Sequence, residues 1–401
     1  AGGSSGLSPE PRTPRKATSV ARIFVPQETR PGERRVAATP ETVKKLVGAG
    51  FEVEIQRGAG VAAGYSDGAY EALGASLVTS APAASASADV VLRVAAPSDA
   101  EAASLKEGSI LFALLDPYRN LGLVRRLAER SVTSFAMELV PRTTRAQAMD
   151  VLSSQASIAG YKSVLLAANH LGKHLPLMMT AAGTVQPSRV VILGAGVAGL
   201  QALATAKRLG AIVEVSDVRA AVKEQVESLG GRFIDLPELG TADGAGGYAK
   251  EVTREFLDKQ REILKARVAL ADVVIATAQV PGKKAPVLLP RDMVEAMKPG
   301  SVIVDLAAST GGNCELTRAD EEVHHHGVTI LGPSNLAATV ATDASLLYAR
   351  NVLNLLVLLW KDKQLSVPLD DEVVAGTLLT HAGEIRHPAI APLLLDTAVR
   401  A

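Results

Sequence analysis

The sequence contains little that would stabilise it outside a reducing, aqueous environment. Cys314 is the single cysteine, so no intrachain disulfide can form. Aromatic residues make up only 3%, which predicts a core of aliphatic side chains. No apolar run reaches the roughly 18–20 residues that span a bilayer, and the longest candidate, residues 352–360, is interrupted by Asn354. We therefore expect a soluble chain that associates with a membrane only through a partner.

An excess of one charge is also absent. Lys and Arg together number 42, and so do Asp and Glu, so the balance favours no nucleic acid or acidic surface as a partner. The chain has length and apolar content instead, since 401 residues that are 47% hydrophobic suffice for two domains. Residues 1–19 are poor in apolar residues, and we interpret them as a disordered extension, with a processed targeting segment or a cloning remnant as alternatives.

The ordered sequence begins with alternating strands and helices. Strand-like runs lie at 22–26, 51–55, 90–94, 110–115 and 132–136. A helix is predicted from Pro40 to about Val47, with Thr39 as N-cap and Gly50 beyond its end, and another at 121–130. This alternation predicts a parallel sheet covered on both faces, without a glycine fingerprint.

Two long helices separate this region from a second one. They are predicted at about 146–171 and 344–361, and the tail, 367–392, is expected to fold back on the first region. Strands of the second region are expected at 190–193, 212–215, 232–234, 273–276, 302–305 and 329–331, with a flexible loop at 240–247. The predicted fold is α/β: two Rossmann-like, doubly wound parallel-sheet domains (20–150 with 345–401, and 151–344) joined by two long helices with a cleft between them.

The most informative motif follows the strand at 190–193. There Gly194-Ala195-Gly196-Val197-Ala198-Gly199 opens a helix, and a second strand ends in Asp217. Strand, glycine turn, helix, strand and acid, in this order, are typical of a dinucleotide site. The glycines permit a tight turn and close approach of a pyrophosphate to the helix N-terminus. Asp217 can accept a hydrogen bond from a ribose 2′-hydroxyl and would repel a 2′-phosphate, so NAD(H) is favoured over NADP(H).

Several segments together resemble one family, the soluble NAD(H)-binding component (domain I, α1-type subunit) of proton-translocating NAD(P) transhydrogenase. The likeness runs from about Arg22 to Pro388. It is carried by PQETRPGERRVAATP (26–40), PRTTRAQAMD (141–150), LSSQASIAGY (152–161), MTAAGT (179–184), GYAKE (247–251), PGKKAP (281–286), VDLAA (304–308) and GGNC (311–314).

The resemblance implies a homodimer of two-lobed protomers that bind NAD(H) in the cleft. Hydride would pass directly to NADP(H) on a partner component, coupled to proton translocation by a membrane-spanning component. The chain would lie peripherally on the cytoplasmic side of an inner membrane, or in an organellar matrix if residues 1–19 are a processed targeting segment. It ends where the membrane portion of fused forms would begin, which suggests a separate subunit or an excised domain.

The resemblance also assigns residues to the site. Arg142, Asp150 and Ser153 would hold the nicotinamide carboxamide, and Gln147 would reach toward the partner's nucleotide. From the residues alone, Asp150 and Ser153 are equally typical of a helix cap. Tyr248 would close over the nucleotide, and the remaining expected cofactor contacts follow strands or belong to the glycine turn: Gly194, Ala195, Gly196, Val197, Gly199, Asp217, Val218, Arg219, Thr277, Ala278, Asp305 and Leu306.

Two other functions stay open at this point. An alanine dehydrogenase shares the fold, but its catalytic His after the strand at 110–115 is replaced here by Asp116, and a family lysine by Arg93. Arg35 matches an arginine that contacts substrate in alanine dehydrogenases, and we interpret it here as structural. A non-catalytic NAD-binding regulatory module would not need the polar loop at 142–153.

We expect no metal site. Consecutive residues such as His324, His325 and His326 do not readily converge on one ion, and His170 with His174 lacks a following Glu. Cys314 has no adjacent base, so we interpret it as a small packed residue.

Overall fold

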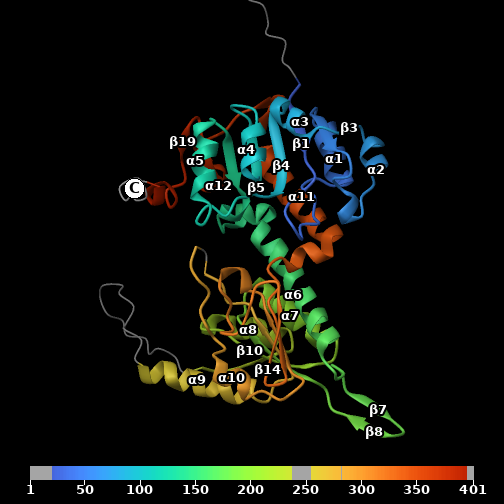
Figure 1. Ribbon diagram of the computed structural model, residues 1–401, viewed down its shortest axis with the longest axis vertical. Helices are drawn as coiled ribbons and strands as arrows, with labels where there is room; N and C mark the ends of the chain where they lie inside the picture. The colour runs from blue at the N-terminus through green and yellow to red at the C-terminus, as the bar shows by residue number, and fades with distance from the viewer. Residues whose placement is uncertain (1–19, 237–253, 281, 395–401) are drawn as a thin grey trace, which may run out of the picture.

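The computed structural model describes residues 20–236, 254–280 and 282–394, and two sheets lie one beyond the other along its long axis (Figure 1). The long helix α6 (Val151–His170) runs from one sheet to the other, and α11 (Ala341–Leu358) packs beside it. The predicted residues 1–19, the loop at 240–247 and Tyr248 lie outside the described residues. None of the helices in the described ranges is long and apolar enough to cross a bilayer.

The first sheet has eight strands, of which six are parallel. In spatial order they are β19 (Glu384–Ile385), β18 (Leu378–His381), β6 (Thr133–Ala136), β5 (Ile110–Leu114), β4 (Val90–Ala95), β1 (Arg22–Val25), β2 (Glu52–Gln56) and β3 (Ser76–Val78). The expected return of the tail is confirmed, because β18 pairs with β6. That pairing is antiparallel, which the prediction of a purely parallel sheet missed.

Side chains of this sheet are buried on both faces, as a sheet covered by helices requires. On β1, Ile23 and Val25 enter one core while Phe24 enters the other. The covering helices are α1 (Pro40–Gly48), α2 (Asp67–Glu71), α3 (Ala81–Ser87), α4 (Asp99–Ser104), α5 (Leu121–Glu129) and α12 (Glu372–Thr377).

The second sheet has the strand order of a dinucleotide fold. The order is β11 (Arg232–Phe233), β10 (Ile212–Ser216), β9 (Arg189–Leu193), β12 (Val273–Ala276), β13 (Val302–Asp305), β15 (Val328–Leu331) and β14 (Glu322–His325). The first six are parallel and follow the chain order 3-2-1-4-5-6 of a doubly wound sheet. An antiparallel edge strand, β14, was not predicted. The helices here are α7 (Val197–Arg208), α8 (Lys223–Ser228), α9 (Arg254–Val268) and α10 (Arg291–Glu295).

Both long helices differ from their predicted bounds. The 3₁₀ segment Thr144–Met149 precedes α6, so that helix begins five residues later than predicted, after Asp150. Helix α11 ends before a short hairpin of β16 (Trp360–Lys361) and β17 (Gln364–Leu365), which replaces its last predicted turn. A second hairpin, β7 (Met178–Thr180) with β8 (Gly183–Val185), was not predicted and projects from the second lobe (Figure 1).

Candidate functional site

A cleft of about 1410 Å³ is lined by residues of both sheets and of the helices between them. Open α/β sheets bind ligands outside the carboxyl ends of their strands, and β9, β10, β12 and β13 all end at this cleft. The structure brings most predicted site residues to its wall: Arg142, Gln147, Asp150, Ser153, Gly194, Ala195, Gly196, Val197, Asp217, Val218, Arg219, Thr277, Ala278 and Leu306.

The glycine turn has the geometry that its sequence predicts. Gly194 has a φ of +107°, and a Cβ there would lie 2.5 Å from Oγ1 of Thr277. A Cβ on Gly199 would meet the carbonyl oxygen of Gly194 at 1.8 Å, so the first turn of α7 packs directly on the loop. A Cβ on Gly196 would instead enter open space. Gly194 and Gly199 are therefore required by the fold, whereas the space at Gly196 is free for a ligand.

Asp217 holds the glycine turn through its carboxylate. Oδ2 accepts a 2.7 Å hydrogen bond from the N–H of Ala195, and Oδ1 accepts from the N–H and Nε of Arg219 at 2.9 and 3.0 Å. Burial alone would raise the pKa of Asp217, but the Arg219 guanidinium and these N–H groups outweigh it and lower the pKa. The carboxylate is therefore ionised and remains at the cleft wall, where its free lone pairs can still accept from a hydroxyl.

Two predicted residues stand behind the wall rather than in it. Gly199 is one, and Asp305, fully buried, is the other. The Asp305 carboxylate accepts from the N–H groups of Ala307, Asn313 and Cys314 and from Oγ1 of Thr317. The expectation of direct cofactor contact is therefore revised for Asp305, which positions the loops after β13 instead. Tyr248, as noted, is outside the described residues.

Asn313 is a supporting residue that the sequence did not indicate. Its side-chain amide accepts from the N–H of Ala278 and donates to the carbonyls of Ala278 and Pro286, at 2.8–3.0 Å. Thr277 in turn donates to the carbonyl of Gly194 at 3.1 Å. The loop after β12 is thus fixed against the glycine turn. Cys314 is buried, as predicted, and burial raises the pKa of its thiol.

The loop from Arg142 to Asp150 is anchored at several points by the first lobe. The carbonyl of Ala148 accepts from the side-chain amides of Asn351 and Asn354 on α11, at 2.8 and 3.0 Å. Arg145 forms an ion pair with Asp371. Sequence reasoning treated Asn354 only as a polar interruption, because its partner is about 200 residues away in the chain. Anchored in this way, the loop lies against the cleft without contacts to the second sheet being needed to hold it.

This loop presents two unpaired polar side chains to the cleft. Neither Arg142 nor Gln147 makes a side-chain hydrogen bond or ion pair with any residue in the described ranges, and both are exposed. Asp150 caps α6, accepting from the N–H of Ser153 at 2.9 Å and from its hydroxyl at 2.6 Å. The cap interpretation therefore describes Asp150 and Ser153 in the free protein, while both also line the cleft.

Sequence reasoning missed Glu138, an acid in the cleft wall. Its Oε1 accepts from the N–H of Asp116 at 2.5 Å, and its Oε2 is shielded from solvent without a hydrogen-bond partner among the described residues. Burial raises the pKa of Glu138 to about 7. Asp116 itself is exposed and has a φ of +46°. No signal in the sequence distinguishes Glu138 from a surface acid, because its burial depends on residues that only the fold brings around it.

Arg35 also lines the cleft, but its guanidinium is fully engaged. It pairs with Glu33 at 2.7 Å and donates to Gln155 and Asn335 at 2.9 and 3.2 Å. The structural interpretation of Arg35 agrees with these contacts, since no donor is left directed at a ligand.

The fold and its cleft define a class: two-lobed α/β proteins with a dinucleotide-type glycine turn in the second lobe. Comparison with protein-family models narrows this class. The model of the alanine dehydrogenase/PNT N-terminal domain matches residues 24–159, and that of the corresponding C-terminal domain matches residues 163–388. The chain therefore belongs to the alanine dehydrogenase/PNT family.

Individual relatives confirm the resemblance drawn from the sequence. An NAD(P) transhydrogenase alpha subunit of Rhodospirillum rubrum is 51% identical over 378 residues, which cover 92% of this chain and 98% of that protein. A crystal structure of transhydrogenase from Sinorhizobium meliloti is 44% identical, with a TM-score of 0.83, over 91% of this chain and 99% of that one. An L-alanine dehydrogenase structure is more distant, at 30% identity and a TM-score of 0.78, over 94% and 99%.

Proposed function

We propose that this chain is the NAD(H)-binding subunit of a proton-translocating NAD(P) transhydrogenase. Hydride passes directly between NAD(H) in this cleft and NADP(H) on a partner component, and a membrane-spanning component couples the transfer to proton movement. The observation that carries the proposal is the anchored loop at 142–150. It holds Arg142 and Gln147, unpaired among the described residues and exposed, in the wall of the cleft that also contains the glycine turn.

The residues fit the cofactor that this proposal requires. Open space at Gly196 beside the first N–H groups of α7 suits a pyrophosphate, and Asp217 suits an adenosine ribose. Arg142, Asp150 and Ser153 would hold the carboxamide, and the nicotinamide supplies the hydride. The protein's role is alignment and exclusion of water, because transfer between two nicotinamides moves no proton at the reacting carbons.

Histidine placement supports hydride transfer over amino-acid oxidation. All seven histidines lie in described ranges, and none lines the cleft. Oxidation of an amino acid needs a general base near the substrate. Glu138, with a pKa of about 7, is the observation that keeps an alanine dehydrogenase activity as a second candidate. Its Oε1 is occupied by the Asp116 N–H and its Oε2 is shielded, so it is poorly placed to take a proton from a substrate.

The β7–β8 hairpin supports a homodimer. An isolated two-stranded hairpin is marginally stable in water. This one projects from the lobe with Met178, Met179 and Val185 exposed, and Met179 is 75% exposed. A second copy of the chain would cover these apolar groups. The division into 20–150 with 345–401 and 151–344 as domains, and a peripheral position on the cytoplasmic side of an inner membrane, belong to the same proposal.

The decisive experiment is hydride transfer in a reconstituted complex. Gln147→Asn shortens the reach of the amide by one methylene while keeping its chemistry. We expect unchanged NADH affinity, because the contact is to the partner's nucleotide, and a rate at least about tenfold lower, equivalent to about 1.4 kcal/mol of lost alignment. Stopped-flow transfer from NADH to an NADP⁺ analogue measures it, with Gln201→Asn on α7 as the matched control. An unchanged rate in a folded, assembled complex would remove Gln147 from the site.

A further inference from the structure

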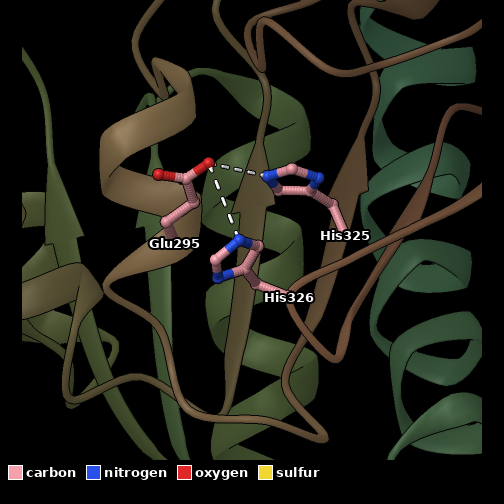
Figure 2. Close-up of side chains that lie close together, drawn as sticks. All are labelled: Glu295, His325 and His326. Carbon is pink, nitrogen blue, oxygen red and sulfur yellow. Dashed lines mark hydrogen bonds and ion pairs between the residues drawn. The ribbon is translucent and has the colours of Figure 1, made fainter.

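Three side chains meet on the surface of the second lobe, far from the cleft. They are Glu295, the last residue of α10, and His325 and His326, at the turn between β14 and β15 (Figure 2). Nε2 of His325 lies 2.9 Å and Nε2 of His326 3.9 Å from Oε1 of Glu295. The candidate ligand atoms of all three residues lie within 4.8 Å of one another.

The turn explains how consecutive histidines converge. His325 pairs with Val328 across the hairpin, leaving His326 and Gly327 as a two-residue loop. Their φ values are +49° and +75°, as a type I′ turn requires. The left-handed backbone at His326 turns its side chain toward that of His325, so the two rings lie 4.8 Å apart. The premise that consecutive histidines cannot converge is therefore wrong here, because it assumed the alternation of an extended strand.

We propose that Glu295, His325 and His326 form a binding site for a divalent transition-metal ion of the Zn²⁺ type. Two imidazole nitrogens and a carboxylate oxygen are ligands that suit Zn²⁺, whereas Ca²⁺ and Mg²⁺ favour oxygen alone. A tetrahedral ion with bonds of about 2.0–2.1 Å separates its ligands by roughly 3.3 Å. The observed 2.9 and 3.9 Å lie on either side of that value. A water molecule would complete the coordination, since two of the three side chains are exposed.

The position of the site predicts what the metal does. The turn precedes β15, so it lies at the amino ends of the parallel strands, opposite the edge that borders the cleft. An ion there links α10 to the edge hairpin and adds stability without touching the cofactor. The proposal is thus independent of the proposed function.

The test is titration of untagged protein with Zn²⁺ by calorimetry, and with Co²⁺ by visible absorption. We expect one ion per chain, with affinity falling between pH 7.5 and 5.5 as the histidines protonate. His326→Ala and Glu295→Gln should each weaken binding by at least about tenfold, as loss of one ligand does. His326→Ala is the cleaner variant, because the 2.9 Å pair between His325 and Glu295 stays intact.

His324→Ala is the matched control. His324 belongs to the same hairpin, but its Nε2 lies 3.2 Å from Glu322, on the other face of β14. It should bind Zn²⁺ within about twofold of the wild type. Zn²⁺ should raise the thermal midpoint of the wild type and of His324→Ala, and leave that of His326→Ala unchanged. Absence of saturable binding, or equal weakening by His324→Ala and His326→Ala, would overturn the proposal.

Discussion

Two glycines of one turn separate a cofactor contact from a packing requirement. Gly196 has a φ of −79°, which any residue adopts, and a Cβ there would meet no atom within 4 Å. Gly196→Ala therefore leaves the fold intact. It replaces glycine by a poorer N-cap, which costs about 0.5–1 kcal/mol, and it restricts the unfolded chain, which offsets a similar amount. We expect a net change in stability within about 0.5 kcal/mol.

The same substitution places a methyl group where a pyrophosphate must approach the helix N-terminus. NADH affinity should fall by at least about tenfold, or 1.4 kcal/mol. Gly199→Ala is the contrasting variant, because its Cβ would lie 1.8 Å from the carbonyl oxygen of Gly194, whereas ordinary contact begins near 3.4 Å. The backbone must move by more than an ångström, so stability should fall by about 2 kcal/mol or more.

Isothermal titration with NADH and thermal unfolding of the two variants and the wild type measure both effects. A Gly196→Ala protein that binds NADH as the wild type does would refute the assignment of the pyrophosphate to this turn. A Gly199→Ala protein with unchanged stability would refute the packing argument.

Three further predictions follow from single contacts. Asp217→Asn keeps an acceptor for the Ala195 N–H but loses the charge, so NADH binding should weaken by about 1–3 kcal/mol in titration calorimetry; tighter binding of NADPH than NADH by the native protein would contradict the assignment. Burial raises the pKa of Glu138 from 4.5 to about 7, so the folded state retains this proton while the unfolded state loses it, and stability declines as pH rises through that window. Glu138→Gln should remove that decline and exceed the wild type at pH 8 by up to about 3 kcal/mol in denaturant unfolding, and equal pH profiles would exclude a buried acid. With L-alanine and NAD⁺ we expect no NADH production across about pH 7–10; turnover near 1 s⁻¹ would favour the alanine dehydrogenase alternative.

The second sheet was predictable because local signals there agree with each other. Val302–Asp305 and Val273–Ala276 were predicted with their observed bounds, since each is a short apolar run bordered by polar or small residues. The glycine turn was predictable for the same reason, as each glycine meets its steric requirement within the turn or with the neighbouring strand.

Features set by distant residues were not predictable. The start of α6 was placed five residues early because 144–149 has helical spacing, yet it forms a 3₁₀ segment held by Asn351 and Asn354 of α11. Glu138 owes its raised pKa to burial that exists only in the folded chain. The meeting of His325 and His326 depends on a turn whose edge strand lacks a hydrophobic alternation.

The interpretations of Asp150 as helix cap and as ligand-binding residue are compatible. In the cap, Oδ1 accepts from the Ser153 N–H and Oδ2 from the Ser153 hydroxyl, one donor for each oxygen. A carboxylate oxygen has two lone pairs, so each can accept a further hydrogen bond from an amide N–H in the cleft. The cap fixes the carboxylate before a ligand arrives, which removes the entropy cost of ordering it. A residue type that sequence reasoning assigns to either a cap or a site can therefore serve in both, because the cap leaves half of its acceptor capacity free.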